Sequence, residues 1–304
     1  MAGLASWALR RVTAGRSPLI ESAASFLAGP WLHQGLVKGA VEHKLFGRSG
    51  LAALSFDVDY QADVKALDLL LNELDRHSLK ASFAVVGQWV KAHTEPHRAL
   101  VQAGHEVVNH TLSHPDNEEL DPNRHFHLLG PEELKAQIME AHRIIEDILS
   151  ISPSGFRAPH FGHQHTEAVY PLLRELGYLY SSSTLASRSP SFGWPHQAGQ
   201  GLLELPVTVC PRHPFSSFDT WHYLRRQPNR HRPGDFLNNL NMLLNLAASG
   251  TFPLSFYFDP RDVADQGVCR QALVLLAESG LEITTLRGWL EGLSGEGKEG
   301  EEPS

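Results

Sequence analysis

The sequence predicts an α/β protein built on a mainly parallel sheet, and three observations support this. Short apolar segments alternate with longer segments whose apolar residues recur at helical spacing. Strands and helices in alternation form parallel sheets through right-handed crossovers. Polar residues follow several of the apolar segments directly, as they do at the strand ends where barrel active sites gather. We therefore expect a closed barrel rather than an open sheet.

The short apolar segments imply seven or eight strands. In chain order these cover residues 51–57, 80–86, 105–109, 154–157, 178–182, 202–207, 254–258 and 281–285. The expected helices lie between them, and Leu67, Leu70, Leu71 and Leu74 illustrate their apolar spacing. These helices cover residues 62–76, 94–103, 131–149, 166–176, 234–248 and 266–279. Residues 192–206 read as a loop that leads into a strand.

Composition is ordinary for a globular protein, because 42% of the 304 residues are apolar and 20% are charged. The net charge of −8 argues against a general affinity for nucleic acid. Cys210 and Cys269 are too few for a disulfide framework, so a reducing compartment is permitted. In the N-terminal segment the arginines follow the apolar stretch, which reverses the order of a secretory signal. We expect a cytoplasmic protein.

The two ends of the chain differ from the centre. Residues 1–48 carry a net charge of +4 against −12 for the remainder, and Gly29-Pro30 predicts a break between two short helices. This basic helical N-terminal extension is either a lid packed on the main domain or an anchor on a membrane surface. The main domain covers residues 49–293. Residues 294–304 are acidic, have nothing apolar to bury and predict a disordered tail.

Two carboxylates end the first expected strand, in the segment LSFDVDY at residues 54–60. Because side chains alternate along a strand, Asp57 and Asp59 point the same way and share one pocket. The alternative is an ordinary solvated strand end, where aspartate accepts turn hydrogen bonds.

A histidine pair follows the third expected strand, in NHTLSHP. The i, i+4 spacing of His110 and His114 lies on one face of a helical turn, from which both imidazoles reach one cation. With 18 histidines in the chain such a pair also arises by chance, and Pro115 limits any helix there to a short turn.

The two aspartates and the histidine pair, taken together, indicate a metal-binding catalytic site. Asp59, His110 and His114 are two imidazoles and one carboxylate, a set that leaves coordination positions for water and substrate. Asp57 then remains as a general base for a metal-bound water. Arg157, after the fourth expected strand, gives Asp57 a charge partner that keeps it ionised and oriented.

The sequence resembles the polysaccharide deacetylase family (carbohydrate esterase family 4), in the subgroup with a D-x-D motif. The resemblance lies in SFDVD, NHTLSHP, GFRAPHFG, SFYFDP and GLEITTLRGWL, in family order over roughly residues 50–292. It implies a distorted (β/α)7 barrel and an enzyme that removes acyl groups from N-acylated sugars. By position, the resemblance makes Asp57 the base and Arg157 its partner. It makes Asp59, His110 and His114 the metal ligands, and the backbone after Pro159 the oxyanion donor.

One position departs from the family pattern. Where the family has a histidine that protonates the leaving amine, this sequence has Asp259 in SFYFDP. Asp259 serves as this acid only if its pKa is raised well above about 3.9. Alternatively His160 or His163 donates the proton, or turnover is lost while metal binding survives.

The loop at residues 205–236 is rich in proline and arginine and also carries Trp221 and Tyr223. Its aromatic rings are candidates for stacking on a sugar, and its arginines for meeting the phosphate of a lipid- or nucleotide-linked sugar. The alternative is a solvated loop with structural aromatics. With Pro159 and His160, Trp221 completes the expected substrate-binding residues.

The expected function is therefore metal-dependent removal of an N-acyl group, most simply N-acetyl, from a sugar during synthesis of a cell-surface glycan or glycolipid. Zinc is the expected ion, with cobalt, manganese, iron and nickel as alternatives. The rival functions are a non-haem iron oxygenase, a metal-free hydrolase of cyclic amides, and a sugar-binding module that lacks a proton donor. The sequence leaves the oligomeric state open.

Overall fold

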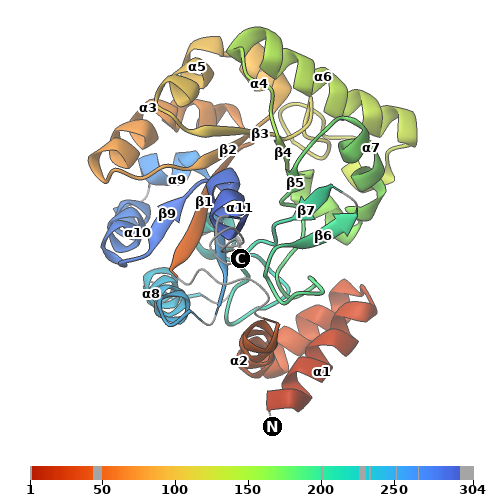
Figure 1. Cartoon of the computed structure of the whole chain (residues 1–304), viewed down its shortest axis with the longest axis vertical. Coiled ribbons are helices and arrows are strands. Elements are labelled where there is room, and N and C mark those ends of the chain that lie inside the picture. The colour runs from red at the N-terminus through yellow and green to blue at the C-terminus, as the bar shows by residue number, and fades with distance from the viewer. Residues whose placement is uncertain are drawn as a thin grey trace, which may run out of the picture.

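The computed structural model describes residues 2–43, 50–199, 201–225, 231–232, 234–250, 252–265 and 267–294. A curled sheet runs through the centre, and helices cover its outer face (Figure 1). The strands in these ranges are β1 (Leu51–Val58), β2 (Ser82–Val85), β3 (Glu106–Asn109), β4 (Gly155–Phe156), β5 (Tyr180–Ser181), β6 (His196–Gly199), β7 (Leu202–Glu204), β8 (Leu254–Phe258) and β9 (Glu282–Thr284). They form one sheet in the order β6-β7-β5-β4-β3-β2-β1-β8, and β9 also pairs with β1.

The α-helices and the shorter 3-10 or π-helical turns fill the connections. The α-helices are α1 (Ala2–Ala14), α2 (Pro18–Glu42), α3 (Gln61–Arg76), α4 (Gly87–Ala92), α5 (Thr94–Gln102), α6 (Pro131–Leu149), α7 (Tyr170–Glu175), α8 (Asp235–Ala248), α9 (Pro260–Asp265), α10 (Gly267–Glu278) and α11 (Leu286–Ser294). The short turns are η1 (Phe126–Leu128), η2 (Pro159–Gln164), η3 (Glu167–Val169) and η4 (Trp221–Arg225).

The predicted parallel barrel is confirmed, in a distorted form. All strand pairs in the described residues are parallel except β6 with β7. Between β7 and β8 the ring is closed by Thr208, whose N–H donates to Ser255 O at 2.9 Å and whose hydroxyl accepts the Ser255 N–H at 2.8 Å. This side of the barrel is therefore held by side-chain and loop bonds instead of a regular strand.

Strand β1 shows how the sequence separates the two sides of the sheet. All eight of its residues are buried, as expected for a central parallel strand. Leu54 and Phe56 pack in the large core with the surrounding helices, whereas Leu51 and Ala53 pack in a separate cluster with Trp289 of α11. Because side chains alternate, Asp57 continues the row of Leu51 and Ala53 into the barrel interior.

Strand β6 and the helix breaks differ from the prediction. Residues 196–199, expected in a loop, form β6 against β7, and the expected helix 166–176 is divided into η3 and α7. The predicted break at Gly29-Pro30 is confirmed to within one residue. Ala28, at φ −145°, is non-helical, and two helical segments meet there in a kink within α2, because Pro30 lacks the N–H and clashes with the preceding turn. A further break, near Arg16 at φ 45°, separates α1 from α2.

Helices α1 and α2 pack against each other and against the barrel (Figure 1). The Arg10 guanidinium lies 3.6 Å from the Phe192 ring centre and donates to Ser189 O at 2.5 Å. Glu21 of α2 forms a buried ion pair with Arg188, and the Trp194 indole donates to Ala40 O at 2.8 Å. The described part of the N-terminal extension is thus joined to the main domain.

None of the helices in the described residues combines the length and apolar character that a membrane span requires. Residues 295–304, most of the predicted disordered tail, lie outside the described residues.

The pairing of Gly155 in β4 with Tyr180 in β5 gives a first prediction. An added Cβ at Gly155 would lie 2.1 Å from the Tyr180 ring, so Gly155→Ala forces the buried ring aside. We expect Gly155→Ala to lower the free energy of unfolding by about 1–3 kcal/mol, measured by urea denaturation. Gly267→Ala is the matched control, because its added Cβ meets nothing within 4 Å. Equal midpoints for the two variants would contradict this packing.

Candidate active site

The carboxyl ends of the parallel strands converge on one cavity of about 470 Å³. The predicted site residues that line it are Asp57, Asp59, His110, His114, His160, Trp221 and Asp259. They come from the ends of β1, β3 and β8, from η2 and from η4. Arg157 lies behind Asp57, and Pro159 is buried without lining the cavity. Most of the predicted residues are therefore brought together.

The histidine pair does not lie on the predicted helical turn. Thr111 at φ 70° and His114 at φ 50° have left-handed backbone conformations, which side chains brace. Asn109 Oδ1 accepts the Thr111 N–H at 2.9 Å, and Thr111 Oγ1 accepts the His114 N–H at 3.1 Å. This braced loop, rather than helical spacing, directs both imidazoles to one point.

Asp59, His110 and His114 form a candidate metal centre. One ligand atom of each lies within 4.8 Å of the others. Asp59 Oδ1 is 3.2 Å from His110 Nε2 and 3.5 Å from His114 Nε2. The Asp59 carbonyl is fixed by the Trp89 indole at 2.8 Å and the Asn117 amide at 2.7 Å. The second acid of the D-x-D segment is therefore held between the two imidazoles.

The surroundings of the two histidines suit a cation. His110 Nδ1 lies 2.7 Å from Arg157 O, a bond in which Nδ1 carries the proton and leaves Nε2 facing Asp59. Burial lowers the pKa of His110, but the bond to Asp59 and the charges of Asp59 and Asp57 outweigh it and raise the pKa overall. Burial lowers the pKa of His114 to about 3. A proton and a cation therefore compete for the space between His110 and Asp59.

Asp57 is held apart from this centre by a buried arginine. Arg157 Nη1 donates to Asp57 Oδ1 at 2.5 Å and to Ser55 Oγ at 2.9 Å. Burial raises the pKa of Asp57, and the opposing charges of Arg157 and His110 do not cancel this rise. Arg157 therefore orients a carboxyl whose affinity for protons is increased by burial, and the expectation that it keeps Asp57 ionised stays a prediction.

Asp259 lies in a cluster of acids. Burial, then the charges of Asp63 and Asp262, raise the pKa of Asp259 well above its ordinary value. Its Oδ2 is buried and has no hydrogen-bond partner among the described residues. Its backbone N–H donates to Thr220 Oγ1 at 3.0 Å. The raised pKa of Asp259 meets the condition under which this residue could serve as the acid.

Sequence reasoning missed a second acid–base pair. His222 lines the cavity, and its Nδ1 lies 2.5 Å from Asp219 Oδ2. Asp219 is completely buried. The D-x-x-H spacing of FDTWH was the signal available for this pair.

Other residues of the 205–236 loop lie elsewhere than expected. Tyr223 is buried in the core and is therefore not a stacking platform in the cavity. Arg212 pairs with Asp235 at 3.2 Å, and Arg225 pairs with Asp262. Arg226 and Arg230 lie outside the described residues, as does the side chain of His163.

A second cavity of about 560 Å³ adjoins the first, because His160, Phe161 and His222 line both. Arg10 of helix α1 and Arg16, just after this helix, belong to its wall. The N-terminal extension therefore borders the space into which a long substrate would continue.

Comparison with known proteins finds a matching family model for part of the chain. The polysaccharide deacetylase family model matches residues 47–181. A chitooligosaccharide deacetylase of Sinorhizobium fredii is 34% identical over 76 residues, which are 25% of this chain and 31% of that protein. The chain thus spans a minor part of the curated relatives it matches, with 26% and 38% for two others.

Two solved structures share the fold. A putative polysaccharide deacetylase from Mycobacterium smegmatis superposes with a TM-score of 0.66 and 19% identity, covering 84% of this chain and 94% of that one. A CE4 family pseudoenzyme from Bacillus anthracis superposes with a TM-score of 0.52 and 16% identity, covering 80% and 66%. The match to the family model and the motifs in family order make the chain similar to the polysaccharide deacetylase family, and the solved structures share its fold.

Proposed function

We propose that this protein is a metal-dependent hydrolase that removes the N-acetyl group from an N-acetylated sugar. One observation carries the proposal. Asp59, His110 and His114 converge within 4.8 Å, while Asp57 stands in the same cavity without being one of them. Such a division leaves one carboxylate to bind a cation and the other to move protons.

The ligand set fits a divalent cation such as zinc. Two imidazoles and one carboxylate are ordinary ligands of catalytic zinc, and three protein ligands leave positions for water and substrate. The buried Nδ1 of His114 has no hydrogen-bond partner in the described part of the chain, so neighbouring hydrogen bonds do not hold this ring in another orientation. When bound, the ion would polarise the acyl carbonyl and lower the pKa of its water.

Two residues then carry out the two proton transfers, one as a base and one as an acid. Asp57, oriented by Arg157, accepts a proton from the attacking water. Asp259 donates a proton to the departing amine, and its raised pKa keeps this proton available. Trp221, 39% exposed at the cavity wall, supplies an apolar face for a sugar ring. The backbone after Pro159 remains the proposed oxyanion donor.

The substrate proposal rests on the relatives. Several curated relatives are named chitooligosaccharide deacetylases, so we take an oligosaccharide of N-acetylglucosamine as the first substrate to test. The adjoining cavity leaves room for further sugars or for a lipid- or nucleotide-linked phosphate, which Arg10 and Arg16 would meet. This chemistry suits synthesis of a cell-surface glycan or glycolipid.

A second candidate function is a sugar-binding module that lacks turnover. It is favoured by the replacement of the family's histidine by Asp259 and by the existence of a pseudoenzyme with this fold. The two functions differ in whether Asp259 works as an acid.

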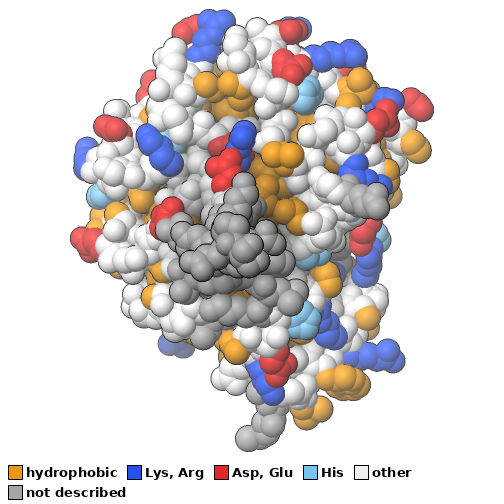
Figure 2. Space-filling model, viewed as in Figure 1, with side chains coloured by type: hydrophobic (Ala, Val, Ile, Leu, Met, Phe, Trp, Pro, Cys, Tyr) orange, Lys and Arg blue, Asp and Glu red, His pale blue; other side chains and the backbone are white. Residues whose placement is uncertain are grey.

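We also propose that α1 and α2 contact the cytoplasmic surface of an anionic membrane. Figure 2 shows apolar side chains over α1 at the lower end of the molecule. The large apolar side chains of these two helices with 47% to 84% exposure are Leu4, Trp7, Leu19, Ile20, Phe26, Leu27 and Val41. Residues 1–48 also carry a net charge of +4, which favours an anionic lipid surface.

The division of roles between the two acids gives the second prediction. Asp57→Asn should keep the bound metal and lose turnover by at least about 10²-fold, because only the base is removed. Asp59→Asn should lose the metal itself, since a ligand is removed. Metal content and release of free amine from the sugar measure the two effects. Equal metal loss in both variants would contradict the assignment.

Two further measurements separate the rival enzymes. Turnover that resists a chelator would support a metal-free amide hydrolase. Loss of turnover without oxygen would support an oxygenase.

The proton donor gives the third prediction. Asp259→Asn should lower kcat by about 10²-fold, and wild-type kcat should fall as pH rises through the raised pKa of Asp259. His222→Asn is the matched test of the other proton carrier in the cavity and should retain more turnover. If instead the wild type is inactive and Asp259→His creates hydrolysis, the natural protein is the sugar-binding module.

Membrane contact gives the fourth prediction. The double variant Trp7→Ser, Leu27→Ser should lower partitioning onto phosphatidylserine-containing vesicles at least about tenfold, because each exposed side chain contributes about 1–2 kcal/mol on burial. Added salt should weaken binding further by screening the basic residues. Leu69→Ser, on α3 and 37% exposed, is the control. Equal partitioning of all three proteins in sedimentation would exclude this surface.

A further inference from the structure

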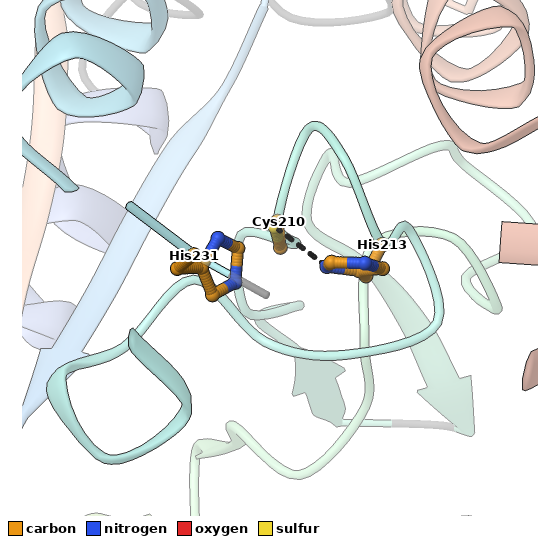
Figure 3. Close-up of side chains that lie close together, drawn as sticks. All are labelled: Cys210, His213 and His231. Atoms are coloured by element: carbon orange, nitrogen blue, oxygen red, sulfur yellow. Dashed lines mark hydrogen bonds between the residues drawn. The ribbon is translucent and has the colours of Figure 1, made fainter. Parts of the chain in front are cut away.

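A second cluster of metal-ligating side chains lies outside the candidate active site. Cys210, His213 and His231 come together between the end of the barrel sheet and the start of α8, with the two imidazoles on either side of the sulfur (Figure 3). None of the three lines the candidate active-site cavity. The family resemblance assigns them no role.

The spacing of this cluster matches a tetrahedral ion. Zinc bonds of about 2.3 Å to sulfur and about 2.0–2.1 Å to nitrogen place the two ligand atoms about 3.6 Å apart. Cys210 Sγ lies 3.8 Å from His213 Nδ1. One nitrogen of His231 completes a set whose atoms lie within 4.8 Å of one another, so closing on an ion needs movements of about 1 Å.

An unsatisfied imidazole nitrogen also points to a ligand. The buried His231 Nδ1 has no hydrogen-bond partner among the described residues.

Groups around the cluster would support a thiolate. The Tyr223 hydroxyl lies 3.0 Å from Cys210 Sγ and accepts the Asn239 amide at 2.9 Å, which leaves its own O–H to donate to sulfur. Asp235 Oδ2 lies 4.0 Å from His231 Nδ1, beyond hydrogen-bond distance, and adds negative charge beside the cluster. Burial raises the pKa of the free Cys210 thiol, so a metal would have to displace its proton.

We propose that Cys210, His213 and His231 bind one zinc ion, with water as the fourth ligand, at a site separate from the candidate active site. A soft thiolate with two imidazoles selects zinc over magnesium or calcium. The ion would join the loop after β7 to the residues just before α8. Between them lies η4, which carries Trp221 and His222, so this ion would stabilise one wall of the active-site cavity.

Cobalt substitution tests the site without relying on activity. Co²⁺ bound to a thiolate absorbs in the near ultraviolet by charge transfer, and only this cluster offers a cysteine ligand among the described candidate sites. We expect the full-length protein to show this band and to bind about two ions per chain. Cys210→Ser should abolish the band and remove about one ion. Cys269→Ser is the matched control, since Cys269 is also a buried free cysteine but lies outside both candidate sites.

Three further outcomes decide the proposal. Asp59→Asn should remove the other ion and keep the band, which separates a failure of the catalytic proposal from a failure of this one. If Cys210→Ser does not fold, His213→Asn tests the site from the surface side of the cluster, where it should also abolish the band. A wild-type protein that takes up cobalt without the band, or whose band survives in either variant, would overturn the site and leave Cys210 as a core residue.

Discussion

The candidate site depends on one buried cation, the guanidinium of Arg157, which is 1% exposed. Burying a charge is costly unless it is paired and hydrogen-bonded, and here Nε donates to Ser182 O, Nη2 to Ser182 Oγ, and Nη1 to Ser55 and Asp57. The backbone of the same residue accepts the His110 Nδ1 proton and donates to Asn109 O. One residue therefore orients the proposed base, one proposed ligand and the ends of four strands. A change at Arg157 would disturb all of these together, which makes it a poor choice for isolating any single role.

The acids around the cavity explain how an aspartate can stand where the family has a histidine. A histidine supplies a proton near pH 7 from its ordinary pKa, whereas an aspartate needs its surroundings to raise the pKa. Asp259 is buried beside Asp63 and Asp262, and not all of these carboxyls can be ionised in so small a volume. Arg225 pairs with Asp262, and Arg261 lies 3.5 Å from Asp63, so the available positive charge goes to the neighbours of Asp259. In the proposed role of Asp259, its buried acidic neighbours would keep available the proton that the family takes from a histidine.

The sequence was sufficient for features that depend on local pattern, and insufficient for those that depend on distant contacts. Strands β1 and β8 were predicted within one residue because central strands are apolar along their whole length. The meeting of Asp59 with His110 and His114 followed from parallel strand ends and from the family motifs. The left-handed turn at Thr111 was not predicted, because it depends on bonds from the side chains of Asn109 and Thr111. His222 was missed because its position against the cavity depends on the whole 205–236 loop. The proposed metal cluster was not predicted, because His231 follows Cys210 by 21 positions in the sequence.

The N-terminal extension connects the two proposals about substrate and membrane. Helix α1 has only 13 residues. Arg10 of this helix and Arg16, just after it, line the second cavity, while Leu4 and Trp7 are exposed to solvent. Arg10 is fixed by Phe192 and by the backbone of Ser189, so the helix has little freedom to turn about its axis. A membrane surface that contacted Leu4 and Trp7 would therefore lie beside the basic wall of the second cavity. For a sugar carried on a lipid phosphate, this arrangement would keep the lipid in the membrane, the phosphate near Arg10, and the acyl group within reach of Asp57.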